Sequence, residues 1–245
     1  DGEPIRPGRI YVAPPDLHMM VEGGQIRLVR GPKENRHRPA VDPLFRSAAL
    51  HYGERAIGVI LTGSLDDGTA GLLEIKRQGG ITIVQHPDDA LFRGMPESAC
   101  RTVEVDRCLP LLGIGPGIVQ LVGSTEAGLE EPMAGEPSNL DYETRIAAAD
   151  QAAIEQEDRP GVPSPFGCPE CGGVLWEIHN DRMIRFRCRV GHAYSPESLL
   201  ASQSEELESA LWAAMRGLEE KASLTRRLAQ RARELSQAGA AERFD

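Results

Sequence analysis

The chain has 245 residues, a length that allows one large domain or two of moderate size. Apolar residues make up 40% of it and charged residues 26%, so a packed core is expected. The net charge of −10 argues against a protein that binds nucleic-acid phosphates, and the aromatic content of 4% argues against a base-stacking surface. No apolar stretch is long enough to span a membrane and no secretory signal opens the chain, so we expect a cytoplasmic protein without membrane insertion.

Residues 1–123 are expected to form an α/β domain. The segment RIYVA before two prolines predicts a buried strand, and a hairpin follows around a Glu-Gly-Gly-Gln turn. Asp42-Pro43 opens a helix that Gly53 ends. A strand, loop, helix and strand come next, and this unit predicts a right-handed crossover in a parallel sheet. The predicted ranges are 9–13, 19–21, 26–29 and 42–53, then 56–61, 62–69, 70–78 and 81–85.

The loop at 62–69 carries the candidate chemistry. Sites in parallel sheets form beyond the carboxyl ends of the strands, where this loop falls. It contains Asp66 and Asp67, and a carboxylate at such a place can orient a histidine in a hydrolytic triad or bind a hard cation. The residues alone leave a plain turn open as well, because Asp-Gly is ordinary turn chemistry.

Five sequence blocks stand in order in this region: PGRIYVAPPDLHM (7–19), RHRPAVDPLFRSAA (36–49), VILTGSLDDGTAGL (59–72), GGITIVQ (79–85) and FRGMPESA (92–99). Together they resemble the C-terminal two-thirds of the catalytic domain of the CheB family, the chemotaxis protein-glutamate methylesterases. The resemblance implies a doubly wound parallel sheet and hydrolysis of receptor glutamyl methyl esters by Ser, His and Asp without a catalytic cofactor. It also implies that Asp67, in the TG-x-x-x-D-G frame, is the triad aspartate and that Asp66 is not.

The chain departs from the family pattern in two ways. The family's nucleophilic serine and base histidine precede the position at which this chain begins, and His18 and His37 do not stand at the base position. We therefore expect a domain truncated at its N-terminus, and a polypeptide that is inactive by itself, because an aspartate without its histidine cannot catalyse. Much of the family also has Gly-Met-Gly where this chain has Gly63-Ser64-Leu65, which affects contacts from the loop to the substrate.

Residues 124–165 are predicted to be an acidic linker. They hold ten acidic and two basic side chains together with five prolines. Low hydrophobicity with high charge favours a solvated tether, although a short helix at about 140–157 fits part of the segment.

Residues 166–195 are predicted to be a zinc ribbon. Cys168, Cys171, Cys188 and His192 have the C-x2-C-x16-C-x3-H spacing of a zinc site, and two strands are predicted between the pairs. Four filled positions leave no open one, so the zinc is expected to be structural. His179 is a competing fourth ligand, and a redox CxxC is the other interpretation of the first pair. The arginines on the second strand of the ribbon are expected to form a solvated face, with an acidic partner as the alternative; they are Arg182, Arg185, Arg187 and Arg189.

Residues 196–245 are predicted to form a long amphipathic helix. Ser195-Pro196-Glu197 is a helix-start signal, and apolar residues recur at heptad spacing from Leu207 to Leu235 with weak points at Lys221 and Thr225. Coiled-coil self-association is expected, with a helix that folds back on the chain as the alternative. The sequence of the ribbon and helix is similar to the C-terminal extension of some stand-alone CheB-like proteins.

The complete interpretation is an α/β protein with a partial doubly wound parallel sheet, followed by a small zinc ribbon and a long C-terminal helix. Its expected function is the hydrolysis of glutamyl methyl esters on methyl-accepting chemotaxis receptors. Two alternatives stay open: a zinc-dependent interaction or adaptor protein with a vestigial hydrolase domain, and an esterase with another substrate. Cys100 and Cys108 lack a metal spacing and are expected to be buried structural thiols.

Overall fold

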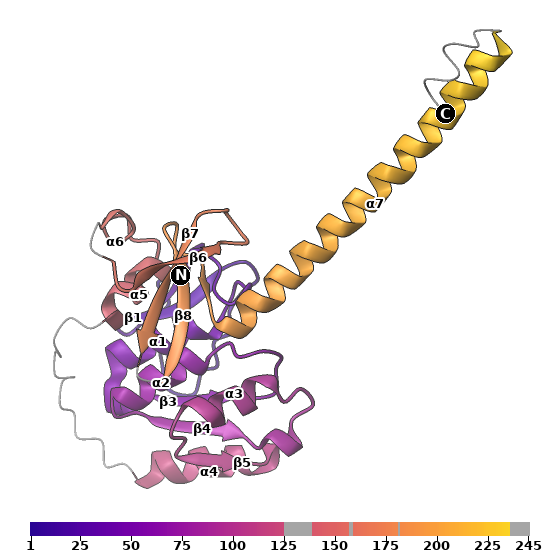
Figure 1. Ribbon diagram of the computed structural model, residues 1–245. Coiled ribbons are helices and arrows are strands. Elements are labelled where there is room, and N and C mark those ends of the chain that lie inside the picture. Colours follow the sequence, from indigo (N-terminus) through magenta and orange to yellow (C-terminus); the bar gives the residue numbers. More distant parts are fainter. Residues whose placement is uncertain (125–138, 157–158, 181, 236–245) are drawn as a thin grey trace. The chain divides into compact units, whose positions relative to one another are not determined.

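The structure is a computed structural model that describes residues 1–124, 139–156, 159–180 and 182–235 (Figure 1). Contacts within the chain divide it into two units, Asp1–Leu199 and Leu200–Asp245. In the described residues no helix is both long enough and apolar enough to cross a membrane.

The larger unit contains a three-stranded parallel sheet with the strand order β3-β4-β5. β3 and β4 are mostly apolar, as expected where helices cover a sheet, whereas the edge strand β5 is a short segment with an exposed residue at its centre. Leu72, Ile60 and Val84 are almost fully buried in the core beneath the helices. The elements are β3 (Ile57–Ile60), α2 (Thr69–Arg77), β4 (Ile81–Gln85), α3 (Gly94–Thr102), β5 (Arg107–Leu109) and α4 (Leu111–Ser124), with short 3-10 turns at Gly53–Arg55 and Pro87–Asp89. The predicted unit of strand, loop, helix and strand, with its two strands parallel, is therefore confirmed.

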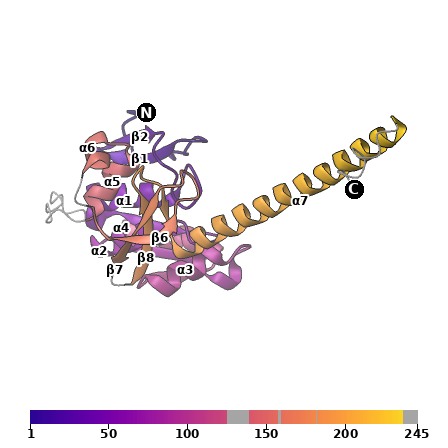
Figure 2. The same ribbon diagram turned by 45° about the horizontal axis from the view of Figure 1, so that its top comes forward.

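An antiparallel hairpin and a helix precede this sheet. β1 (His18–Glu22) pairs with β2 (Gln25–Val29), and α1 (Val41–Tyr52) packs on the hairpin. The N-terminus lies beside β2 (Figure 2), where the amide of Gly2 donates to the carbonyl of Ile26. The buried strand predicted at 9–13 was wrong: Ile10 is 94% exposed, because no strand of the described residues pairs with this segment.

The second half of the acidic segment is folded. Residues 125–138 lie outside the described residues, but α5 (Asn139–Ala147) and α6 (Gln151–Glu155) follow. Leu140 and Ile146 on α5 are buried, and α5 packs on α1, so this part is not a solvated tether. The short helix that the sequence favoured as an alternative accounts for α5 and α6, with a break at Ala149.

A four-stranded antiparallel sheet contains the predicted ribbon. Its strands are β6 (Val162–Gly167), β7 (Val174–Asn180), β8 (Met183–Cys188) and β9 (Ala193–Tyr194), in sequence order. The long helix α7 (Pro196–Glu234) follows directly, which confirms the long helix that the sequence predicts; residues 236–245 of that prediction lie outside the described residues. Cys100 and Cys108, expected to be buried, are both exposed, because they lie at the outer end of α3 and on the edge strand β5.

Candidate functional site

The loop between β3 and α2 lies at the carboxyl end of the parallel sheet, as the sequence predicts. Gly68 ends it with a left-handed φ of 88°, and a Cβ atom there would lie 2.6 Å from Ile60 Cδ1, so only glycine fits. Leu65 also has a positive φ of 60°, at the position where the resembling family has glycine. Such a conformation costs a branched residue about 1 kcal/mol, so the loop is held in shape against a local preference.

Asp67 is half-buried in this loop and both of its carboxylate oxygens accept hydrogen bonds. Oδ2 accepts from the amide of Val41 at 2.7 Å, whereas Oδ1 accepts at longer distances from Asn35 Nδ2 (3.1 Å) and the amide of Asp42 (3.4 Å). The two amides open α1, so Asp67 caps that helix from a different segment of the chain. Burial raises the pKa of Asp67, and the hydrogen bond from the amide of Val41 opposes the rise.

Two further carboxyl groups lie beside Asp67 and are more deeply buried. Asp42 accepts hydrogen bonds from Asn35 Nδ2 and from the amide of Gly71, both at 2.7 Å. Burial and the neighbouring charge of Asp67 raise the pKa of Asp42 to about 7. Burial likewise raises the pKa of Asp66 to about 6, although Ser195 Oγ donates a hydrogen bond to its Oδ1 at 2.7 Å. Both carboxyl groups therefore stay protonated up to a higher pH than the carboxyl group of an ordinary aspartate does.

Asn35 connects this acidic group to the ribbon. Its side-chain amide donates to both Asp42 and Asp67, and its Oδ1 accepts from the amide of Ser195 at 3.2 Å. Its backbone amide donates to the carbonyl of Ala193 at 2.8 Å. Ala193 directly follows His192 in the chain, so the hydrogen bonds of Asn35 link the residue next to a predicted metal ligand with Asp67.

The four predicted metal ligands come together. One ligand atom from each of Cys168, Cys171, Cys188 and His192 lies within 4.8 Å of all the others. His192 Nδ1 is 3.5 Å from Cys188 Sγ and 3.7 Å from Cys168 Sγ, and Cys171 Sγ is 3.7 Å from Cys188 Sγ. A tetrahedral zinc with bonds of about 2.3 Å to sulfur and 2.0 Å to nitrogen requires ligand separations of about 3.5–3.8 Å, so the donor set fits zinc.

Tight turns at both ends of the ribbon hold these ligands. The amide of Gly172 donates to the carbonyl of Cys168, and the amide of Gly191 donates to that of Cys188. A Cβ atom on Gly191, whose φ is 108°, would lie 2.7 Å from Ile146 of α5, so the second turn packs directly on the rest of the unit. The competing ligand His179 lies apart from this group, on β7, where its Nε2 pairs with Glu177 at 2.8 Å.

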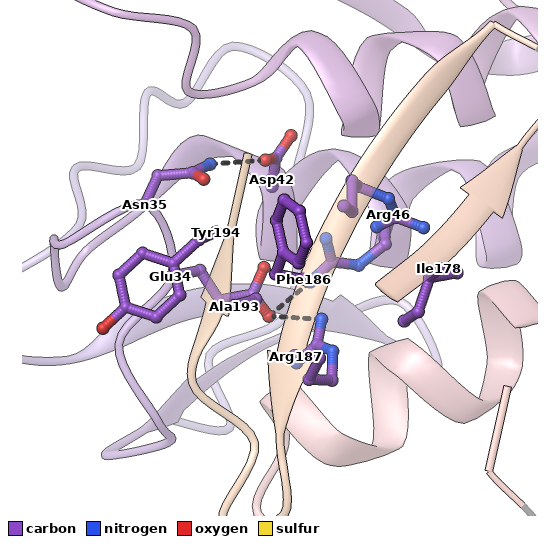
Figure 3. Close-up of a pocket in the computed structure, with 10 residues that line it drawn as sticks. Glu34, Asn35, Asp42, Arg46, Ile178, Phe186, Arg187, Ala193 and Tyr194 are labelled. Atoms are coloured by element: carbon purple, nitrogen blue, oxygen red, sulfur yellow. Dashed lines mark hydrogen bonds and ion pairs between the residues drawn. The ribbon is translucent and has the colours of Figure 1, made fainter. Parts of the chain in front are cut away.

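A buried cluster of charges joins the ribbon to α1 and α5 (Figure 3). Both carboxylate oxygens of Glu34 lie 2.6 Å from Arg46 Nη2, and Arg187 Nη2 lies 3.2 Å from Glu34 Oε1. Glu143 of α5 pairs with Arg185 and also lies 3.6 Å from Arg187. Burial alone would raise the pKa of Glu34, but Arg46 and Arg187 lower it to about 2.

The expectation of a solvated arginine face was therefore wrong for Arg185 and Arg187. Both are buried against acidic residues of the same chain, whereas Arg182 stays half-exposed. The alternation of arginines on β8 puts Arg185 and Arg187 on one face, but the sequence could not show that Glu34 and Glu143 cover that face.

Histidines are not among the hydrogen-bond partners of Asp67 in the described part of the chain. His18 is fully buried; its Nε2 lies 2.8 Å from the carbonyl of Pro32, and its Nδ1 accepts from the amide of Ala40. Burial lowers the pKa of His18, which fits a neutral ring with a packing role. Sequence reasoning did not place Asn35, Asp42 and Ser195 at the site; the one available signal was that Asp42 lies within the block RHRPAVDPLFRSAA and that Asn35 directly precedes it.

Comparison with known proteins bears on residues 1–118, which match the family model described as CheB methylesterase. The chain is 45% identical over 115 residues to a protein-glutamate methylesterase/protein-glutamine glutaminase of Bradyrhizobium diazoefficiens, covering 45% of this chain and 32% of that relative. It is 42% identical over 131 residues to a protein of the same name from Yersinia pestis, covering 52% of this chain and 38% of that relative. The CheB methylesterase catalytic domain of Thermotoga maritima is 36% identical with a TM-score of 0.47, covering 49% of this chain and 66% of that one. The chain spans about a third of the length of these two curated relatives.

Proposed function

We propose that this chain belongs to the CheB methylesterase family, whose model residues 1–118 match, and that it serves the hydrolysis of glutamyl methyl esters on chemotaxis receptors. The family match carries this proposal. In this proposal the receptor is the protein substrate, the reaction needs no catalytic cofactor, and it takes place in the cytoplasm, where reduced cysteines such as the proposed zinc ligands persist.

In this proposal Asp67 is the aspartate that orients the base histidine. Such an aspartate fixes the imidazole tautomer and stabilises the cation that forms during acyl transfer. The arrangement of hydrogen bonds supports the assignment, because Oδ2 is held firmly by the amide of Val41 while Oδ1 is held only by long bonds. Oδ1 therefore keeps the capacity to accept a short bond from an imidazole N–H.

The 245-residue chain is proposed to be inactive alone. Neither a serine nor a histidine hydrogen-bonds to Asp67 in the described residues, and without a nucleophile no acyl-enzyme forms. The test is methanol release from a methylated receptor. The chain alone should release none, whereas a longer chain that carries the family's serine and histidine ahead of residue 1 should release it.

Two variants of the longer chain make the test specific. Asp67→Ala should lower methanol release by about 10³–10⁴-fold, as loss of a triad aspartate does. Asp66→Asn is the matched control, because Asp66 faces Ser195 instead, and its activity should stay within a few-fold of the parent. Release by the 245-residue chain that Asp67→Ala abolishes would overturn the inactivity, and an Asp67→Ala variant with full activity would overturn the assigned role.

We further propose that the ribbon binds one structural zinc ion through Cys168, Cys171, Cys188 and His192. When bound, zinc supplies cross-links that a small sheet with little core needs for stability. The three thiolates and the imidazole fill all four tetrahedral positions, so this site activates no water.

The division of the chain into a methylesterase domain at 1–123, an acidic segment at 124–165, a zinc ribbon at 166–195 and a helix at 196–245 is also a proposal.

A second candidate function is a zinc-dependent interaction module whose α/β part is vestigial. The buried ion cluster between β8, α1 and α5 favours it, because the ribbon is integrated with the α/β layer as a binding scaffold would be. The methanol assay separates the candidates: a longer chain that binds methylated receptor yet releases no methanol would support the module.

A further inference from the structure

Cys100 and Cys108 bring two thiols together outside the ribbon. The Sγ atom of Cys100 lies 4.0 Å from that of Cys108, and the Cys100 thiol is the donor in this contact. Both residues are exposed, so small molecules in solution reach the thiols. Cys100 lies near the end of α3, and Cys108 lies in the middle of β5.

The core holds the two backbone segments in place. Ala99, the residue before Cys100, is fully buried in the same apolar cluster as Val84. Val84 of β4 is also the strand partner of Cys108. Because both segments are anchored on one buried cluster, each thiol meets the other at a high effective concentration, which favours a reaction within one chain.

The pair does not have the surroundings of a zinc site. In the part of the chain that the structure describes, the ribbon holds the only group of three or more Cys, His, Asp or Glu ligand atoms. A structural zinc takes four ligands, and this pair supplies two. A disulfide instead needs its sulfurs about 2.05 Å apart, so each sulfur has to move by about 1 Å, a change of the size that side-chain rotation produces.

The surroundings of Cys100 suit it to the second step of such a reaction. Burial, and then the neighbouring Cys108, raise the pKa of Cys100 to about 11, so Cys100 keeps its proton at neutral pH. Peroxides react with thiolates, so the first oxidation is expected at Cys108. The proton on Cys100 is then available to the group that leaves in the second step.

We propose that Cys100 and Cys108 form a reversible disulfide within one chain when a peroxide is present. The Cys108 sulfur attacks hydrogen peroxide, becomes a sulfenic acid and releases one water molecule. The Cys100 sulfur then attacks the sulfur of that sulfenic acid, whose hydroxyl group leaves with the Cys100 proton as a second water molecule. The two thiols lose two electrons in total, the peroxide is reduced to water, and a dithiol reverses the bond.

The disulfide would tie α3 to the edge strand β5. The same helix supports the loop that carries Asp67, since the amide of Met95 donates to the carbonyl of Gly63 at 2.9 Å. Farther along the helix, Thr69 Oγ1 donates to Ser98 Oγ at 3.1 Å. Oxidation is therefore expected to reduce local opening of a helix that packs on the proposed site.

Thiol mapping of the full 245-residue chain, loaded with zinc, tests the proposal. The chain is treated with one equivalent of hydrogen peroxide, labelled with N-ethylmaleimide in denaturant and digested with trypsin for mass spectrometry. The expected product is one linked peptide pair that contains Cys100 and Cys108 and disappears with dithiothreitol. Absence of this linked pair, whatever happens at the ribbon cysteines, or a link between two chains would overturn the proposal.

Serine variants separate the two steps. Cys100→Ser should stop at the sulfenic acid of Cys108, which dimedone traps, whereas Cys108→Ser should show little dimedone labelling of Cys100. Equal labelling in the two variants would overturn the order of oxidation.

Hydrogen exchange tests the tie between α3 and β5. Exchange in residues 94–109 of the parent should slow several-fold on oxidation and recover with dithiothreitol, whereas Cys100→Ser should not change. Unchanged exchange in a parent that carries the disulfide would overturn the effect on α3.

Discussion

Glu34 and its neighbour Lys33 offer a sharp test of how the ribbon is held. Both residues pair across the same boundary, Glu34 with Arg187 of β8 and Lys33 with Glu170 in the first turn of the ribbon. The side chain of Glu34 is 2% exposed, whereas those of Lys33 and Glu170 are 39% and 32% exposed. One ion pair is therefore buried and the other is solvated.

The expected effects differ several-fold. The pKa of Glu34 is lowered from 4.5 to about 2 by Arg46 and Arg187 against the opposing effect of burial, which corresponds to about 3 kcal/mol of stability at pH 7. Glu34→Gln also leaves two buried guanidinium groups short of a counter-charge, a loss of about 3–5 kcal/mol. Lys33→Ala removes a solvated pair and should cost less than about 1 kcal/mol.

Urea unfolding at pH 7, followed by circular dichroism, measures both free energies of unfolding. The difference between the parent and Glu34→Gln should shrink as the pH falls from about 4.5 to about 2, because protonation of a carboxyl group with a depressed pKa removes its contribution. Equal losses of less than about 1 kcal/mol for Glu34→Gln and Lys33→Ala would refute the argument, since the buried cluster would then not hold the ribbon.

Three further outcomes follow from the same contacts. Cys168→Ser should lower the zinc content from about one ion per chain to near zero by atomic absorption, whereas Cys100→Ser, outside the ligand group, should not. Asp66→Asn removes an acid whose pKa is raised to about 6 by burial. As the pH rises from 4 to 6, the parent should therefore lose up to about 3 kcal/mol of its free energy of unfolding relative to this variant. Urea titrations at both pH values measure this difference. Asn35→Ala should cost about 2–4 kcal/mol by urea unfolding, because two buried carboxyl groups lose a donor, and a loss below about 0.5 kcal/mol would contradict its connecting role.

Local signals in the sequence account for the elements that were predicted correctly. Asp42-Pro43 and Gly53 mark the two ends of α1, and continuous apolar runs mark β3 and β4. The cysteine spacing likewise predicted a ligand group that the fold brings together. Each of these signals lies within about thirty residues of chain, over which spacing and pattern have direct structural meaning.

Contacts between distant segments could not be predicted in this way. Ser195 and Asp66 are 129 positions apart, and Arg187 and Glu34 are 153 apart, yet each pair is in contact and buried. A buried arginine on a strand has the same local pattern as a solvated one, so its environment depends on what packs over it. The strand predicted at 9–13 failed for the related reason that an apolar run becomes a strand only beside a pairing partner.

Hydrogen exchange with and without a zinc chelator tests most directly whether the metal-bound ribbon holds the Asp67 loop through Asn35. We expect chelation to raise amide exchange in residues 162–194 and, together with them, in residues 33–42 and 62–72. Faster exchange confined to 162–194, with unchanged protection around Asn35 and Asp67, would contradict the account.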